Sequence, residues 1–197
     1  MSCVPSPRHV AVLLEESLMA IKSQFPTGPK ILLDATYGCG NFSKAILGNT
    51  KVTTKLDVFK RTRIIACDRD PKAIKLALNV ESYNAHKVVP CFTKFSELYQ
   101  NSPEKEVDVV MMDIGFSSMQ VDQEDRGFSY LKDGPLDMRF GQYELVHELF
   151  TPSDWLRITG RKNTGEEDMK AEDVINRFSE SELITIFTKV SIFHPFD

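Results

Sequence analysis

Short apolar runs alternate with amphipathic segments along the first 140 residues. Apolar runs of strand length predict four β-strands, at residues 30–36, 63–68, 87–92 and 107–114. Apolar spacing and helix-start residues predict intervening helices, at residues 9–25, at about 42–48, from Pro71 and from Phe95. This order is typical of an α/β fold in which helices cover both faces of a parallel sheet. Pro90 lies inside the third run and predicts an edge or interrupted strand, because proline cannot donate to a strand ladder.

The pattern changes after residue 140. Phe150 and Trp155 are the predicted apolar anchors of a mixed segment, which is followed by an exposed loop at residues 160–170. Two short helices are then expected at 171–178 and 179–190, the second opening with a Ser-x-x-Glu capping box. We therefore predict two domains, a sheet domain over residues 1–140 and a smaller helical part over residues 141–197.

Three of the predicted strands end in residues suited to ligand binding. A Gly-x-Gly turn at 38–40 follows the first strand and precedes a helix, and glycine lets a ligand approach the main chain. Asp68 ends the second strand, where α/β nucleotide folds place an acceptor for ribose hydroxyls. Asp113 lies at the end of the fourth strand. Because ligands bind beyond the carboxyl ends of parallel strands, we expect these residues and the loop around Phe95 to converge at one edge.

The connection after the fourth strand is longer than most loops in compact domains. Its polar residues are interleaved with aromatic and turn-forming ones; they are Asp113, Ser117, Ser118, Gln120, Arg126, Asp133, Asp137 and Arg139. Such a loop indicates a site rather than a linker, with a plain surface excursion as the alternative. Asp70, by contrast, is better explained as the N-cap of the helix that begins at Pro71.

Composition and charge narrow the classes of partner. The net charge of −4 gives no global basic field, so nucleic acid would need a local patch. The best candidate is an insertion at residues 49–63, which carries Lys51, Lys55, Lys60, Arg61 and Arg63. The alternative interpretation of this segment is a plain solvated loop. No run is long enough to cross a bilayer, and the first ten residues lack the apolar core of a signal peptide. The four cysteines form no CxxC metal pair.

Several segments together resemble the MraW-type methyltransferases. The matching stretches are HVAVLLEE, DATYGCGNFS, ACDRDPKAI, FSEL, DIGFSSMQVDQEDRGFSYLKDGPLDMRF and AEDVINRFSESELITIF. The long loop motif is highly specific, whereas the glycine turn is generic to methyltransferases. The resemblance implies a Rossmann-like sheet with part of a helical insert. It also implies transfer of a methyl group from S-adenosylmethionine to the exocyclic amine of a cytosine in small-subunit ribosomal RNA.

The resemblance also implies which residues bind the cofactor. They are Gly38, Gly40, Asn41, Phe42, Asp68, Phe95, Asp113 and Gln120. Asp68 would accept hydrogen bonds from the ribose, Phe95 would lie beside the adenine, and the glycine turn would pass under the methionine end.

Asp113 is the predicted catalytic residue. A cytosine amine is a poor nucleophile because its lone pair is delocalised into the ring. An acceptor that holds its N–H groups favours the pyramidal form needed for attack, which is catalysis by orientation and placed electrostatics. Asp113 is the expected acceptor, with the backbone carbonyls just after it as the alternative, and we expect Asp113 to serve the cofactor, the amine or both. The target base must also be unstacked; Phe116 or Phe128 would then stack on it, or else serve as plain loop anchors.

Two departures from the family pattern affect these expectations. Gly40-Asn41-Phe42 stands where the family usually reads Gly-Gly-His, and asparagine tolerates positive φ better than most residues. The chain also stops before the family's remaining strands and its Ser-Phe-His-Ser segment. We therefore expect an unpaired apolar edge on the fourth strand, in a truncated member or one whose edge a partner or a second copy covers.

Two other functions compete with an RNA methyltransferase. One is a catalytically inactive module that binds cofactor or RNA. The other is a nicotinamide-dependent oxidoreductase, although Ser43 occupies the place of the third glycine of its fingerprint. The insertions at 49–63 and 141–170 favour a eukaryotic protein of the mitochondrial matrix, with the cytoplasm as the alternative.

Overall fold

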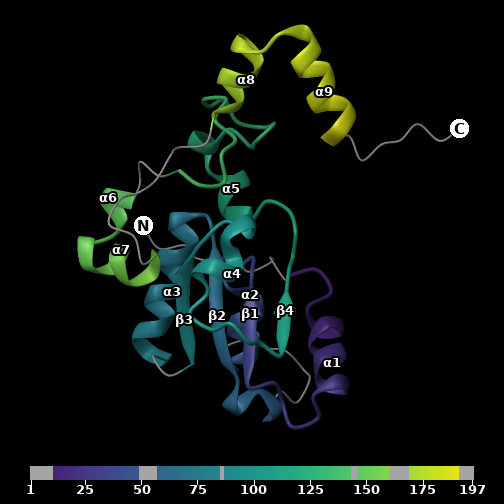
Figure 1. Cartoon of the computed structure of the whole chain (residues 1–197), viewed down its shortest axis with the longest axis vertical. Coiled ribbons are helices and arrows are strands. Elements are labelled where there is room, and N and C mark those ends of the chain that lie inside the picture. The colour runs from purple at the N-terminus through teal and green to yellow at the C-terminus, as the bar shows by residue number, and fades with distance from the viewer. Residues whose placement is uncertain (1–10, 49–56, 85–86, 143–145, 160–168, 191–197) are drawn as a thin grey trace, which may run out of the picture.

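The structure is a computed structural model that describes residues 11–48, 57–84, 87–142, 146–159 and 169–190. Within them, four strands form one parallel sheet in the order β3-β2-β1-β4 (Figure 1). The strands are β1 (Ile31–Asp34), β2 (Arg63–Asp68), β3 (Val88–Phe92) and β4 (Val109–Met111). The predicted α/β fold with a parallel sheet is therefore confirmed, and β3, which contains Pro90, lies at an edge as expected.

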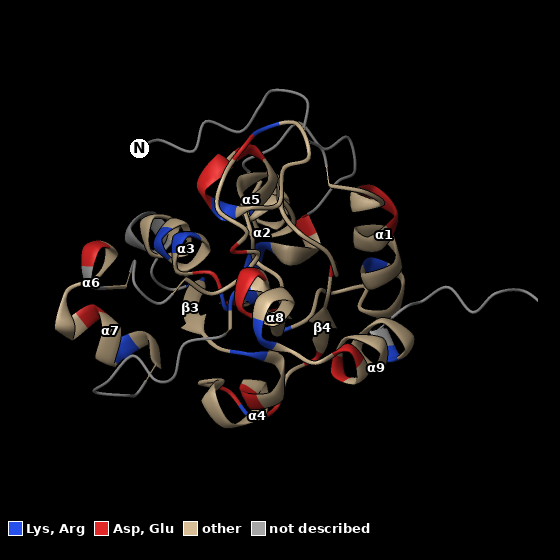
Figure 2. Cartoon of the chain, turned by 90° about the horizontal axis from the view of Figure 1, so that it is seen from above, with Lys and Arg blue, Asp and Glu red and all other residues tan. Residues whose placement is uncertain are grey.

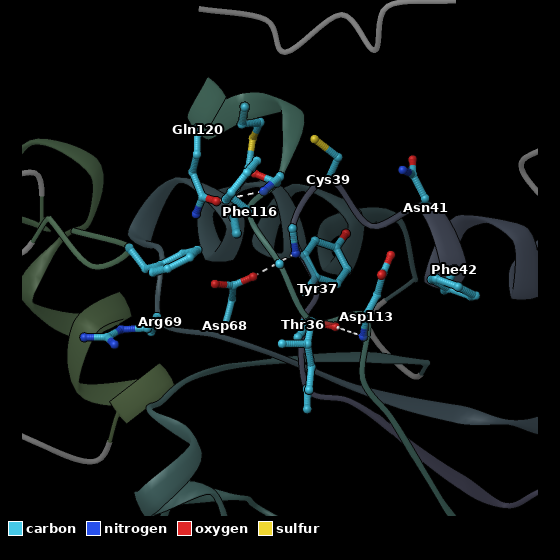
Figure 3. A pocket seen from close by; sticks show the side chains of 18 of the residues that line it. Thr36, Tyr37, Cys39, Asn41, Phe42, Asp68, Arg69, Asp113, Phe116 and Gln120 are labelled. Carbon is cyan, nitrogen blue, oxygen red and sulfur yellow. Dashed lines mark hydrogen bonds between the residues drawn. The ribbon is translucent and has the colours of Figure 1, made fainter. Parts of the chain in front are cut away.

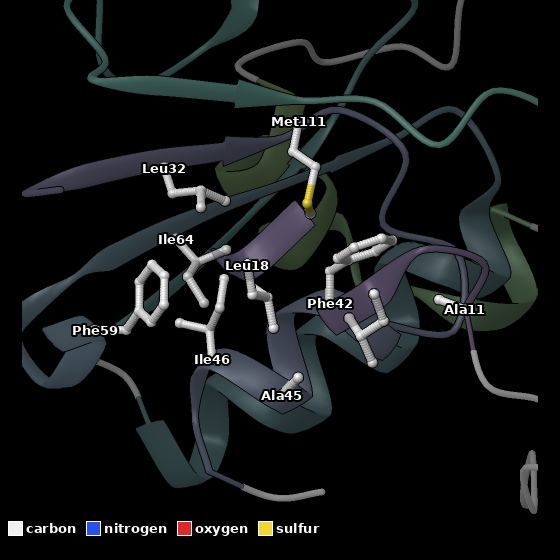
Figure 4. Packing of buried hydrophobic residues seen from close by; sticks show 10 residues of the cluster. Ala11, Leu18, Leu32, Phe42, Ala45, Ile46, Phe59, Ile64 and Met111 are labelled. Carbon is white, nitrogen blue, oxygen red and sulfur yellow. The ribbon is translucent and has the colours of Figure 1, made fainter. Parts of the chain in front are cut away.

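Helices cover the two faces of this sheet according to the alternation of its side chains. Leu32 of β1 and Ile64 of β2 face α1 (Leu14–Gln24) and α2 (Asn41–Ile46), where Leu18, Phe42 and Ala45 complete the buried cluster (Figure 4). Ala66 and Val88 share that face and pack against Ala73 and Ala77 of α3 (Pro71–Asn84). The opposite face carries Leu33, Ile65, Cys67 and Cys91, and Leu98 of α4 (Leu98–Asn101) packs against them. A short 3-10 turn, Phe95–Glu97, precedes α4.

The segment after residue 145 packs on the sheet domain. Val146 and Phe150 lie in or beside α6 (Val146–Leu149), and Trp155 belongs to α7 (Pro152–Thr159). All three are buried with Ile74 and Phe92, and the rings of Phe92 and Trp155 lie 5.0 Å apart. Phe150 and Trp155 are thus confirmed as anchors. The domain boundary at residue 140 stays a prediction.

The long connection contains regular structure that its polar sequence did not predict. β4 ends at Met111 rather than at residue 114, and α5 (Ser118–Asp122) and a 3-10 turn at Glu124–Arg126 interrupt the following loop. The predicted helices at the carboxyl end are present as α8 (Ala171–Arg177) and α9 (Glu180–Val190). The backbone N–H of Ala171 donates to Asp137 O at 2.9 Å, which joins α8 to the loop. The Ser179–Glu182 capping box is confirmed.

The fourth strand carries an exposed apolar flank. In the described part of the chain β4 pairs with β1 alone. Val110 and Met112 lie on the face away from α1 and α2 and are 51% and 47% exposed, and Ile114 beyond them is 77% exposed. The expected unpaired apolar edge is therefore present.

Candidate functional site

A cavity of about 630 Å³ opens at the carboxyl edge of the sheet (Figure 3). Its wall is built by the segments that follow all four strands, as the sequence predicted. Seven of the eight predicted binding residues lie in it: Gly38, Asn41, Phe42, Asp68, Phe95, Asp113 and Gln120. Gly40 is not part of the wall, although it shapes the turn that is.

Glycine is required in the turn after β1 because the backbone folds tightly onto itself. Gly38 and Gly40 have φ values of 51° and 73°, in the left-handed region. A Cβ at Gly40 would lie 2.5 Å from the Tyr37 hydroxyl oxygen. The Tyr37 N–H donates to Cys67 O at 2.9 Å, which ties the turn to the end of β2.

Asp68 holds the glycine turn and the start of α3 together. Its carboxylate accepts from the Gly38 N–H and from the Asp70 N–H, each at 2.8 Å. Burial raises the pKa of Asp68 to about 6, against the lowering effect of these backbone donors. The side chain is half-buried and lines the cavity, so it retains acceptor capacity for a ligand hydroxyl. Its predicted contact with a ribose stays a prediction that this geometry supports.

Asp113 lies across the glycine turn from Asp68, two residues after β4. Its backbone N–H donates to the Thr36 hydroxyl at 2.8 Å, which ties the segment after β4 to the segment after β1 (Figure 3). The Asp113 side chain is exposed and lines the cavity. An anchored backbone with an accessible carboxylate is the arrangement needed to hold a ligand N–H group.

Phe95 and Gln120 lie in the wall in different ways. Phe95 is 54% exposed beside β3, so its ring is available to a flat ligand. Gln120 is buried: its Oε1 accepts from the Ser117 N–H at 2.8 Å, and its Nε2 donates to Asp70 Oδ2 at 3.0 Å. These bonds commit the Gln120 amide to the start of α5, and its predicted cofactor contact stays a prediction.

A buried ion pair that the sequence did not predict secures the long loop. Arg126 is fully buried, and its Nη1 donates to Asp70 Oδ2 at 2.9 Å. Its Nη2 donates to the carbonyl oxygens of Arg139 and Phe140 at 3.1 and 2.9 Å. Asp70 also caps α3 as expected, accepting from the Lys72 N–H at 2.9 Å. The cap residue therefore has a second role, since it joins α3, α5 and the loop.

Asp34 is a second residue near the site that the sequence reasoning missed. It ends β1, is buried, and accepts from the Ser43 hydroxyl at 2.8 Å. Burial raises the pKa of Asp34 to about 7, although hydrogen bonds from Ser43 and the Thr36 backbone oppose the rise. The sequence contains a signal for Asp34, because this residue ends an apolar strand as Asp68 does.

The predicted basic patch lies only partly within the described residues, where Arg61 is exposed. Lys60 pairs with Asp57 at 3.0 Å, and Arg63 pairs with Glu104, while Lys51 and Lys55 lie outside the described residues. Figure 2 shows basic and acidic residues interspersed over the described helices. Over the described part of the chain we find no cluster of side chains suited to a metal ion. Nor does any helix in those ranges have the length and apolar character of a membrane span.

The fold and the cavity define a class of protein, an α/β domain with a ligand site at the carboxyl edge of a parallel sheet. The model of the MraW methylase family matches residues 6–157, and the chain belongs to this family. Members of the family depend on S-adenosylmethionine.

Bacterial relatives support the family assignment over most of the chain. It is 34% identical to the ribosomal RNA small subunit methyltransferase H of Sinorhizobium medicae and 36% identical to that of Rhizobium etli. The enzyme of Agrobacterium fabrum is also 34% identical. Each match covers 91% of this chain and 42% of the relative. The chain thus spans less than half the length of these relatives.

Proposed function

We propose that this chain provides the cofactor site of an S-adenosylmethionine-dependent methyltransferase that acts on the exocyclic amine of a cytosine in small-subunit ribosomal RNA. The observation that carries the proposal is the convergence of Asp68, Phe95 and Asp113 in one cavity beside the glycine turn. These residues lie at or just after the ends of three different strands. The names of the relatives support the RNA substrate, and the family supports the methyl transfer.

The cavity fits the cofactor in size and in chemistry. About 630 Å³ lies within the usual range of roughly 300–1,000 Å³ for small-molecule sites. Asp68 offers an acceptor for the ribose hydroxyls, and the exposed ring of Phe95 offers a stacking surface for adenine. When bound, S-adenosylmethionine supplies a methyl group on a positively charged sulfur.

Asp113 acts on the nucleophile. Its exposed carboxylate accepts an N–H of the cytosine amine, which opposes delocalisation of the nitrogen lone pair into the ring. The bond from its backbone to Thr36 holds this acceptor in place, so orientation does not have to be re-established for each substrate. Catalysis then rests on position and local charge rather than on a strong base.

The proposal is tested in two steps. Isothermal titration calorimetry measures binding of S-adenosylmethionine to the 197-residue chain, and a radiolabelled methyl donor then measures transfer to unmodified small-subunit ribosomal RNA. Binding followed by transfer to a cytosine amine supports the full proposal. Asp113→Ala should lower the turnover with little change in folding, and an Asp113→Ala protein with full affinity and full turnover would contradict the assigned role.

A catalytically inactive binding module is the second candidate. The exposed flank of β4, at Val110, Met112 and Ile114, favours it, because a site braced on one side alone binds more readily than it catalyses. Binding without transfer would support this candidate. The oxidoreductase alternative has no comparable support: Ser43 is buried against Asp34, and the family match points to a methylase.

The cellular and oligomeric predictions are proposals of the same kind. We propose the mitochondrial matrix as the location; the relatives described above are bacterial and lend it no support. We also propose that a partner or a second copy covers the β4 edge. Size-exclusion chromatography with light scattering tests self-association. A chain that ran as a monomer at all concentrations would contradict the second-copy proposal.

A further inference from the structure

Three phenylalanine rings form a row beside the cavity. The centroids of Phe116 and Phe128 lie 5.9 Å apart, and those of Phe128 and Phe140 lie 5.4 Å apart. Both spacings are within the range of favourable aromatic pairs. Phe128 and Phe140 are half-buried, whereas Phe116 is 63% exposed. Phe116 and Phe140 also line the cavity, so the row ends in an accessible ring at the site.

The exposure of Phe116 distinguishes it from an ordinary loop anchor. A ring that serves only as an anchor is buried, as that of Phe42 in α2 is at 7% exposure in the same wall. Phe116 instead leaves most of its ring in water while Phe128 supports it from one side. A supported aromatic ring that remains exposed is a ready surface for another flat ring.

The order of the strands assigns the two exposed aromatic residues of the wall to different parts of the ligand. Phe95 follows β3 and Phe116 follows β4, which are the two edges of the sheet. β2 and β1 lie between them, with Asp68 and the glycine turn at their ends. Three strand spacings of about 4.8 Å separate β3 from β4 by roughly 14 Å. The two rings are thus offered from opposite edges of the sheet, which favours separate roles.

We propose that Phe116 is the stacking platform for the target nucleobase. The inference rests on the proposed function: with adenine at Phe95, the other exposed ring of the wall, Phe116, remains for the target base, and it lies in the same segment after β4 as the acceptor Asp113. Both residues line the cavity and are three positions apart in the chain. A base stacked on Phe116 is thereby held unstacked from its RNA neighbours, with its amine near an acceptor.

A tryptophan at position 116 tests this contact without requiring turnover. The reporter chain carries Trp155→Phe, which removes the single native tryptophan, together with Phe116→Trp. The control carries Trp155→Phe with Tyr130→Trp, because Tyr130 is in the same loop and 92% exposed but does not line the cavity. Both proteins are saturated with S-adenosylhomocysteine and titrated with a single-stranded oligocytidine.

Stacking predicts saturable quenching of the tryptophan at position 116, at least about 3-fold stronger than quenching at position 130. Equal quenching at the two positions, or none at position 116, would overturn the inference. Calorimetry with S-adenosylhomocysteine separates this failure from that of the proposed function. If S-adenosylhomocysteine binds and the tryptophan at position 116 is not quenched, only the stacking role is contradicted. If S-adenosylhomocysteine does not bind, the proposed cofactor site itself is wrong.

A second readout applies to RNA affinity. Phe116→Leu should weaken oligocytidine binding by about 5- to 150-fold, since stacking on one aromatic side chain contributes roughly that factor. Binding of S-adenosylhomocysteine should change less than 2-fold, and Phe116→Tyr should restore RNA affinity. A Leu variant that binds RNA as well as wild type would also contradict the role.

Discussion

Replacing Arg126 by methionine should strongly destabilise the fold, although Arg126 lies in the long loop outside the sheet. Arg126 and Asp70 are 0% and 1% exposed, so neither charge has solvent to replace its partner. Breaking a buried pair costs about 3–5 kcal/mol. Asp70 keeps the donors of Lys72 and Gln120, which favours the lower half of that range. The carbonyl oxygens of Arg139 and Phe140 lose the donor that Arg126 supplies, which favours the upper half of that range. We expect a loss of about 4 kcal/mol.

Urea denaturation followed by Trp155 fluorescence measures this loss. The matched control is Lys60→Met, which breaks the exposed Lys60–Asp57 pair and should cost less than about 0.5 kcal/mol. The double variant Asp70→Asn/Arg126→Met should be more stable than the sum of the single effects predicts, because no unpaired carboxylate remains buried. A loss below about 1 kcal/mol for Arg126→Met would refute the reasoning.

Three further predictions follow from the site. Gly40→Ala should lower stability by about 1–3 kcal/mol, because φ is 73° and the new Cβ meets the Tyr37 hydroxyl; unchanged urea midpoints would contradict the turn geometry. Asp34→Asn should gain stability relative to wild type as pH rises from 5 to 8. The pKa of Asp34 is raised to about 7 in the folded protein, so the wild type loses stability as this carboxyl ionises, whereas the amide does not. A difference in urea midpoint between the two proteins that stays the same at every pH would argue against this. Affinity for S-adenosylmethionine should fall as pH drops through about 6, where Asp68 takes up a proton, and titration calorimetry on Asp68→Asn should show a flatter profile.

Much of the sheet and of the site follows from local patterns. The apolar runs of β1, β2 and β3 mark strands because both faces of a parallel sheet are covered. The position of Asp68 then follows from chain order alone, since residues at the carboxyl ends of parallel strands share an edge. Phe95 and Asp113 follow two other strands of the same sheet and therefore reach the same edge.

Other features depend on pairings that no local pattern records. Arg126 and Asp70 are 56 residues apart, and nothing near either residue in the sequence identifies the other as its partner. The apolar run of β4 extends to residue 114, but the ladder ends at Met111 because β1 is its neighbour in the described residues and ends at Asp34. Packing of α7 on Phe92 likewise arises from tertiary contact, which the change in composition after residue 140 does not record.

Titration calorimetry of S-adenosylmethionine into the 197-residue chain tests the central claim most directly. We expect one binding site in the wild type. The control variant Asp133→Asn should retain it, because Asp133 is an exposed carboxylate outside the cavity wall. Asp68→Ala should weaken binding by about 10- to 150-fold, the effect of losing a hydrogen bond to a charged group. A folded wild-type chain that binds no S-adenosylmethionine, or an Asp68→Ala variant that binds it as tightly as wild type, would contradict the account.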